Sequence, residues 1–166
     1  MSRARAEAMR ISYSEEEDYP GQFELWQANC ERSLRGREGQ AELRELREAL
    51  LALPDKRLIH GSLIDAEGEV CAIGAYAQRK GLDLSTFDPE DETDKVGIIA
   101  GMPKMVAWKV VEMNDMELHS RFTPEERYRL MLQWVESKLQ SANAGKPQPA
   151  NEPAEERQKQ KNETLP

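Results

Sequence analysis

The stretch KRLIHGSLIDAEGEVCAIGAYAQRKG, residues 56–81, decides the fold because its VCAIGAYA part leaves almost no polar face. An apolar, strand-like run over residues 58–64 leads into a turn signal at 65–68 and then into the small and apolar residues VCAIGAYA. Such a segment has to be buried, so it predicts a short β element followed by a central helix. Gly74 costs about 1 kcal/mol relative to alanine inside a helix, which predicts close approach by a neighbouring backbone.

Charged amphipathic helices are predicted on both sides of this segment. Apolar residues recur there at intervals of three and four, and the expected helices cover 22–34, 40–53, 93–101, 104–116 and 124–140. Gly36 and Gly39 separate the first two helices, which we expect to pack antiparallel or against a common third element. Thr123 and Pro124 followed by two glutamates give the strongest start signal, because they supply an N-cap hydroxyl, a proline at the first helical position and first-turn acids.

These elements predict an α+β fold that is predominantly α-helical. About five helices would pack around the central small-residue helix, with a minor β-hairpin or short sheet in which 58–64 pairs with the run around residues 11–13 or with another strand. We expect a mobile N-terminus over 1–10 and a single globular domain over 11–140. Residues 141–166 are rich in proline and polar side chains, which predicts a disordered tail.

Composition and charge narrow the classes of function. The formal net charge of −8 argues against direct binding of nucleic acid, which needs clustered lysine and arginine, and favours a partner with a basic surface. No apolar run approaches the length that spans a bilayer, and no secretory signal is visible at the N-terminus. Cys30 and Cys71 each lie among apolar neighbours, as buried reduced thiols do, so we expect a soluble protein of the cytoplasm.

Catalytic candidates are few. A pair of His60 and Cys71 is geometrically possible across the predicted strand and helix, but an apolar helix around Cys71 would raise the pKa of its thiol and hide it. Asp65, Glu67 and Glu69 flank a glycine, yet a calcium loop would need a carboxylate at its twelfth position, where this chain has Tyr76. We therefore predict no enzyme, no cofactor and no metal site. A small Cys/His enzyme or metal protein stays as an alternative.

Two acidic clusters are the candidate partner-binding residues. Carboxylates so close in sequence repel one another, which indicates either solvated loops or a surface for a cationic partner. The candidates are Glu15, Glu16, Glu17, Asp18, Asp88, Glu90, Asp91, Glu92 and Asp94.

Four stretches resemble a family of small, uncharacterised proteins encoded by phages and prophages. They are EEDYPGQFELWQANCERSLRG (16–36), LIDAEGEVCAIGAYAQRKGL (63–82), AGMPKMVAWKVVEMND (100–115) and TPEERYRLMLQWV (123–135). The resemblance covers roughly residues 11–139 and carries no activity or site residue with it. It implies a mobile-element origin, in which small accessory proteins often bind and disable host machinery.

The resemblance and the acidic charge together lead to one main hypothesis. The protein would be a phage or prophage accessory protein in the cytoplasm of a bacterial host, and it would cover a basic surface of a host factor such as a defence nuclease. A component of a phage structural assembly, held by its amphipathic helices, is the remaining alternative.

Overall fold

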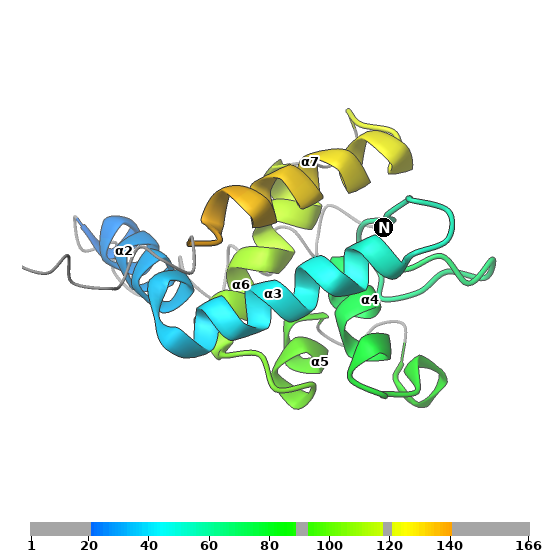
Figure 1. Ribbon diagram of the computed structural model, residues 1–166, viewed down its shortest axis with the longest axis horizontal. Coiled ribbons are helices and arrows are strands. Elements are labelled where there is room, and N and C mark those ends of the chain that lie inside the picture. Colours follow the sequence, from blue (N-terminus) through cyan, green and yellow to red (C-terminus); the bar gives the residue numbers. More distant parts are fainter. Residues whose placement is uncertain (1–20, 89–92, 118–120, 141–166) are drawn as a thin grey trace, which may run out of the picture.

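The computed structural model describes residues 21–88, 93–117 and 121–140, and within these ranges it is all-α (Figure 1). Six α-helices and no β-strand occur in this part of the chain. The α-helices are α2 (Gln22–Arg35), α3 (Arg37–Ala52), α4 (Ala72–Arg79), α5 (Thr93–Ile99), α6 (Lys104–Val111) and α7 (Pro124–Lys138). A 3-10 turn, η1 (Leu84–Thr86), follows α4, and a π-helix, η2 (Glu112–Glu117), continues α6.

Helix α4 lies at the centre, as its small residues predict. It packs against α3, α5 and α6, and every residue from Ala72 to Ala77 is buried. A Cβ on Gly74 would lie 2.4 Å from the carbonyl oxygen of Leu63, so a backbone does approach the helix at this glycine. Only glycine lets the segment 58–64 lie so close to the helix.

The predicted β element is wrong for the described residues. Residues 58–64 form no strand, and a single antiparallel bridge joins Ile64 to Val70 across the turn. The backbone groups of the segment find other partners, because Leu58 N donates to the carbonyl of Pro124 and Ile59 N donates to that of Val70. An apolar run can be buried in extended form without a second strand when turns and helix ends supply its hydrogen bonds.

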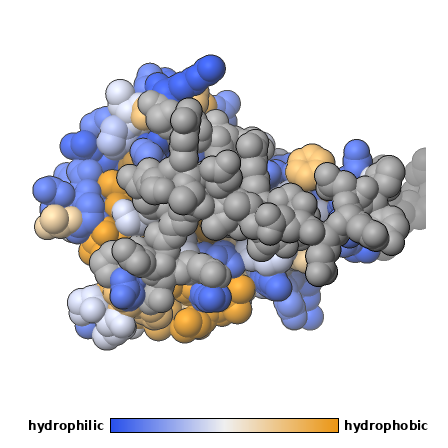
Figure 2. All heavy atoms as spheres, turned by 180° about the vertical axis from the view of Figure 1, so that it is seen from behind, coloured by the Kyte–Doolittle hydropathy of each residue, from blue (hydrophilic) through white to orange (hydrophobic). Residues whose placement is uncertain are grey.

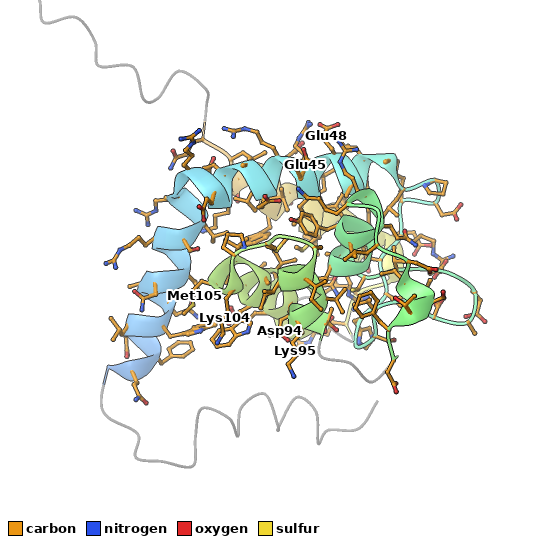
Figure 3. All side chains as sticks on the ribbon, turned by 90° about the horizontal axis from the view of Figure 1, so that it is seen from below. Glu45, Glu48, Asp94, Lys95, Lys104 and Met105 are labelled. Atoms are coloured by element: carbon orange, nitrogen blue, oxygen red, sulfur yellow. The ribbon has the colours of Figure 1, made fainter. Side chains whose placement is uncertain are left out.

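Helices α2 and α3 do not lie antiparallel. Gly36 alone separates them. Figure 3 shows α2 running steeply across the direction of α3. A Cβ on Gly39 would lie 2.0 Å from the carbonyl oxygen of Ser33, so the first turn of α3 rests directly on the end of α2. Helix α2 then packs on α6, whereas α3 packs on α4 and α7.

The predicted start of α7 is confirmed, whereas the predicted end of α6 is not. The N-cap predicted for α7 is present and forms part of a capping box, since Thr123 Oγ1 accepts from the backbone N of Glu126 and the Glu126 carboxylate accepts from Thr123 N. The helix predicted over 104–116 instead changes to π-helical geometry after Val111. π-Helical turns are rare and occur mostly as single turns inside α-helices.

No helix in the described ranges is long and apolar enough to cross a membrane. The predicted N-terminus over 1–10, the run at 11–13 and the tail over 141–166 lie outside the described residues.

Candidate functional site

Asp88 and Asp94 are the two predicted partner-binding acids that the structure describes, and the other named acids lie outside the described residues. Asp88 is exposed, and Asp94 is half-buried in the first turn of α5. Asp94 Oδ2 accepts a 2.6 Å hydrogen bond from the indole nitrogen of Trp108 on α6. Lys104 Nζ lies 4.4 Å from the centre of the same indole ring, and Figure 3 shows Asp94 and Lys104 along one edge of the molecule.

Helix α5 also exposes large apolar side chains. Its inner face holds Val96 and Gly97 against the core, whereas Ile98 is 38% exposed and Ile99 is 62% exposed. Figure 2 shows hydrophobic residues gathered along the lower edge of the molecule, the edge at which α5 lies in Figure 1. The helix that carries Asp94 therefore has an apolar surface of its own. Sequence reasoning named the acids here but not the two isoleucines.

The Cys71 thiol does not have the surroundings of a nucleophile. Cys71 is 2% exposed and serves as the N-cap of α4, where its Sγ accepts from the backbone N of Gly74 at 3.3 Å. Burial, followed by the negative charge of Asp115, raises the pKa of Cys71 to about 12. His60 lines an open cleft whose lining does not include Cys71. A thiol with such a pKa stays protonated and unreactive near neutral pH.

No group of three or more His, Cys, Asp or Glu residues that could hold a metal ion occurs among the described residues. The acids of the 65–69 turn have a structural task. Asp65 Oδ1 accepts from the backbone N of Glu67 at 3.1 Å and of Glu69 at 2.8 Å, and Gly68 has a φ of 84°. Asp65 thus closes the turn in the way asparagine and aspartate often do.

A buried polar cluster that sequence reasoning missed lies between the segment 58–64, η2 and α7. Arg127 is 1% exposed, and its Nε donates to the carbonyl of Asn114 at 3.2 Å while its Nη1 donates to that of Leu58 at 3.4 Å. Its Nη2 is buried and has no hydrogen-bond partner among the described residues. Burial lowers the pKa of Arg127 and the charge of Asp115 opposes that change, so the guanidinium remains charged at neutral pH.

Asn114 and Asp115 complete the cluster. The Asn114 side chain donates to the carbonyl of Ile59 at 3.0 Å and accepts from the backbone N of Ala72 at 3.3 Å. Asp115 Oδ1 accepts from the backbone N of Gly61 at 3.2 Å. These contacts hold the segment 58–64 between η2 and α7 in place of a second strand.

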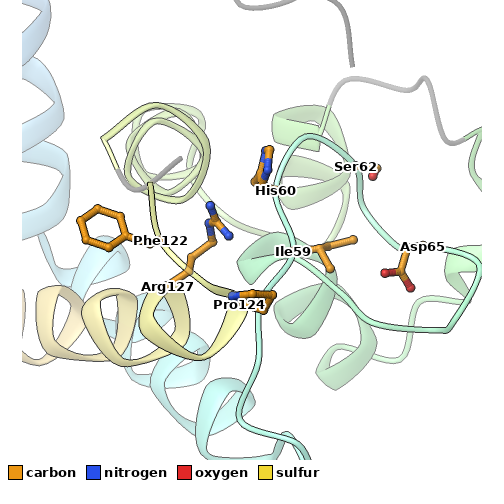
Figure 4. Close-up of a pocket in the computed structure, with 7 residues that line it drawn as sticks. All are labelled: Ile59, His60, Ser62, Asp65, Phe122, Pro124 and Arg127. Carbon is orange, nitrogen blue, oxygen red and sulfur yellow. The ribbon is translucent and has the colours of Figure 1, made fainter. Parts of the chain in front are cut away.

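A cleft of about 320 Å³ opens beside this cluster (Figure 4). Figure 4 shows Arg127 rising from α7 into the space between Phe122 and His60, with Ser62 and Asp65 at the opposite end beyond Ile59. The lining residues are Ile59, His60, Ser62, Asp65, Phe122, Pro124 and Arg127.

Two signals in the sequence could have revealed the cluster. Arg127 precedes Met131 by four residues and Val135 by eight, which places a charged residue on the apolar stripe of α7. Asn114 similarly follows Met113 at the end of an apolar helix. A polar residue on a core-facing stripe needs a buried partner, which is information that periodicity alone does not supply.

Comparisons of the chain with models of protein families, with curated proteins and with solved structures found no match. The resemblance to phage-encoded proteins therefore stays a prediction.

Proposed function

We propose that the protein acts by binding another protein and covering a basic surface on it, as a phage-type accessory protein would cover a host defence nuclease. The observation that carries the proposal is the pairing of an acidic segment with exposed apolar side chains on α5. Asp94 supplies negative charge on α5, and Ile98 and Ile99 supply apolar surface on the same helix. Asp88 is an exposed acid that precedes the helix in the sequence.

The two kinds of side chain have complementary tasks in a protein interface. Apolar side chains at the centre of an interface provide most of the binding free energy, since their removal from water contributes about 25 cal/mol per Å². Acids around them attract a basic partner and raise the rate of encounter. Asp94 accepts its hydrogen bond from a neutral indole, so its negative charge is not cancelled by that contact.

The acids of α3 are less suited to this task, although they are numerous. Glu45 pairs with Arg79 at 2.9 Å and Glu42 pairs with Lys80 at 3.0 Å. Their charges are already balanced by cations of α4 and of the residue after it. Helix α5 is favoured over α3 as the surface that meets a partner because its Ile99 is 62% exposed, against 38% for Leu51 of α3.

The buried thiol supports a non-catalytic role. The alternative of a Cys/His enzyme needs a thiolate that substrate can reach, and Cys71 is both buried and held protonated by its surroundings.

The test begins with affinity capture from the lysate of a phage-susceptible bacterium, after digestion of nucleic acid. Captured proteins are identified and purified, and their affinity for the chain is measured by titration calorimetry at several salt concentrations. We expect binding to a basic protein, weakened about tenfold between 50 and 300 mM salt, with inhibition of any nuclease activity that the partner has.

Matched variants then locate the surface. Asp88→Asn with Asp94→Asn should weaken binding about tenfold, because asparagine keeps an acceptor for Trp108 but removes the charge. Glu38→Gln with Glu67→Gln removes the same charge from exposed positions elsewhere and should leave the affinity unchanged. Equal effects of the two double variants, or saturable binding that salt does not weaken, would contradict the proposal. Light scattering that shows a large self-assembly would instead favour a structural component.

A further inference from the structure

We propose that the ring face of Trp108 and the carboxylate of Asp94 form a binding site for an arginine side chain of the protein partner, and that Lys104 covers this ring face until the partner binds. The inference rests on the proposed function, because it names the side chain that the surface of α5 takes from a basic partner. The site joins two helices, since Asp94 lies in the first turn of α5 whereas Lys104 and Trp108 lie one turn apart on α6.

The first support is that this ring already holds a cation. The Nζ of Lys104 lies 4.4 Å from the centre of the Trp108 ring, within the distance of about 6 Å at which an aromatic face attracts a positive charge. Lys104 is exposed and Trp108 is half-buried. A ring face that is covered by an exposed, flexible side chain becomes accessible when that side chain turns into water, so a ligand can reach it.

The second support is a carboxylate beside the ring that lacks a cation of its own. Asp94 Oδ2 accepts a 2.6 Å hydrogen bond from Trp108 Nε1, which places the carboxylate at the edge of the ring. Among the described residues, no salt bridge joins this carboxylate to Lys104 or to another cation. A side chain that lies over the ring and also donates to Asp94 would make both contacts at once.

The chemistry of the site selects arginine over lysine. A guanidinium is planar, so it can stack on the indole, and it has several donors with which to reach a carboxylate at the ring edge. It is also more weakly hydrated than an ammonium group and loses less when it leaves water. Lys104 contacts the ring but not Asp94, so an arginine that displaces it gains the carboxylate in addition.

Apolar side chains of α5 lie close to the site. Ile98 follows Asp94 by four residues, which places both on the same face of the helix, and Ile98 and Ile99 are both exposed. Figure 3 shows Asp94 and Lys104 along one edge of the molecule, where a partner can approach. An attraction between a cation and a ring strengthens when water is removed, so the isoleucines would increase the contribution of the arginine at an interface.

The test is a titration of the full chain with an end-blocked tetra-arginine peptide, followed by NMR of the tryptophan indole Nε1–Hε1 signals. The Trp108→Phe variant identifies the signal of Trp108 by its loss. We expect that signal to shift saturably, with a dissociation constant on the order of 1 mM. A tetra-citrulline peptide has the same shape without the charge and should bind at least about tenfold more weakly. A tetra-lysine peptide should bind about threefold more weakly.

Matched variants separate the site from general attraction by an acidic chain. Lys104→Gln removes the side chain that covers the ring and should strengthen binding of the arginine peptide about fivefold. Lys95→Gln removes the same charge from an exposed position of α5 and should strengthen it less than about twofold. Asp94→Asn should weaken it about tenfold. Both lysines are exposed, so their variants remain informative if the change at Asp94 reduces stability.

Absence of a saturable shift, equal binding of the citrulline peptide, or equal gains from the two lysine variants would overturn the inference. Failure of the proposed function gives a different result. Binding of the arginine peptide at Trp108 without any captured partner would support the site and contradict the proposed function. A captured partner that binds the Lys104→Gln and Lys95→Gln variants equally well would overturn the site and leave the proposed function intact.

Discussion

The surface of α5 and the interior cluster around Arg127 both combine charge with apolar surroundings, but they do so in opposite arrangements. On α5 the isoleucines face outward and the aspartate is tied to its neighbour by one hydrogen bond to Trp108. In the interior the charge itself is enclosed, and backbone carbonyls from two segments of the chain depend on it. Stability should therefore depend on the interior charge, whereas the exposed side chains of α5 should be free to change without loss of the fold.

Replacement of Arg127 should have the largest effect. Arg127→Met preserves much of the volume but leaves the carbonyls of Leu58 and Asn114 without their donor, so the free energy of unfolding should fall by about 2–4 kcal/mol. Urea denaturation at pH 7 measures this loss. Arg129→Met changes an exposed arginine on the same helix and should stay within about 0.5 kcal/mol of the wild type. Similar losses in the two variants would mean that the buried guanidinium does not hold the segment 58–64.

The Gly74→Ala substitution should have the next largest effect on the free energy of unfolding. Whether it stabilises or destabilises the protein distinguishes a crowded helix from an exposed one. On an exposed helix, glycine to alanine would stabilise by about 1 kcal/mol. Here the new Cβ would meet the carbonyl oxygen of Leu63 at 2.4 Å, so Gly74→Ala should lower the free energy of unfolding by about 1–3 kcal/mol. Gly97→Ala is the matched control, because its Cβ would meet the flexible end of the Ile73 side chain at 3.0 Å. Greater loss for Gly97→Ala in the same urea experiment would contradict the close approach at α4.

The sequence predicts the close contact at Gly74 but not the one at Gly39. The small residues around Gly74 indicated a crowded central helix, since few other environments accept a glycine inside an apolar run. Gly39 was read as part of a turn, yet it belongs to the first turn of α3, and the single residue Gly36 turns the chain. Periodicity places helices well but does not give the angle between them, because that angle depends on which backbones can touch.

The candidate sites were predicted less well than the helices. Acidic residues are visible in a sequence, so Asp88 and Asp94 were named, but exposure of Ile98 and Ile99 depends on which face α5 turns to the core. The segment 58–64 has the composition of a strand, and its lack of a partner strand follows from contacts with Asn114 and Arg127, far along the chain. Local pattern cannot supply contacts of that range.

The buried thiols should have an intermediate effect that depends on pH. Burial raises the pKa of Cys30 to about 11 and of Cys71 to about 12, from a usual value near 9. The folded state thus favours the protonated thiols, and this contribution is complete below pH 9 and is lost as pH rises through 11 and 12. At pH 10 the loss should be about 1 kcal/mol for each thiol.

The Cys30→Ala variant isolates this effect from tyrosine and lysine titration in the same range. The variant should lose about 1 kcal/mol less than the wild type between pH 8 and pH 10, as measured by urea denaturation at both values. Iodoacetamide at pH 8 should label neither cysteine until the chain unfolds. Rapid labelling of Cys71 in the folded protein would instead support the alternative hypothesis of a Cys/His enzyme.

Replacement of Ile99 should have the smallest effect on stability and a large effect on binding. It therefore tests most directly the contrast between the surface of α5 and the interior cluster around Arg127. The side chain is 62% exposed, so Ile99→Ser removes little buried surface and should change the free energy of unfolding by less than about 0.5 kcal/mol. If α5 is the interface, the same change should weaken affinity for the captured partner about tenfold or more. Leu51→Ser, which alters a 38% exposed side chain on α3, is the control and should leave affinity unchanged. Loss of stability without loss of affinity at Ile99 would place this residue with the interior cluster and remove α5 from the proposed interface.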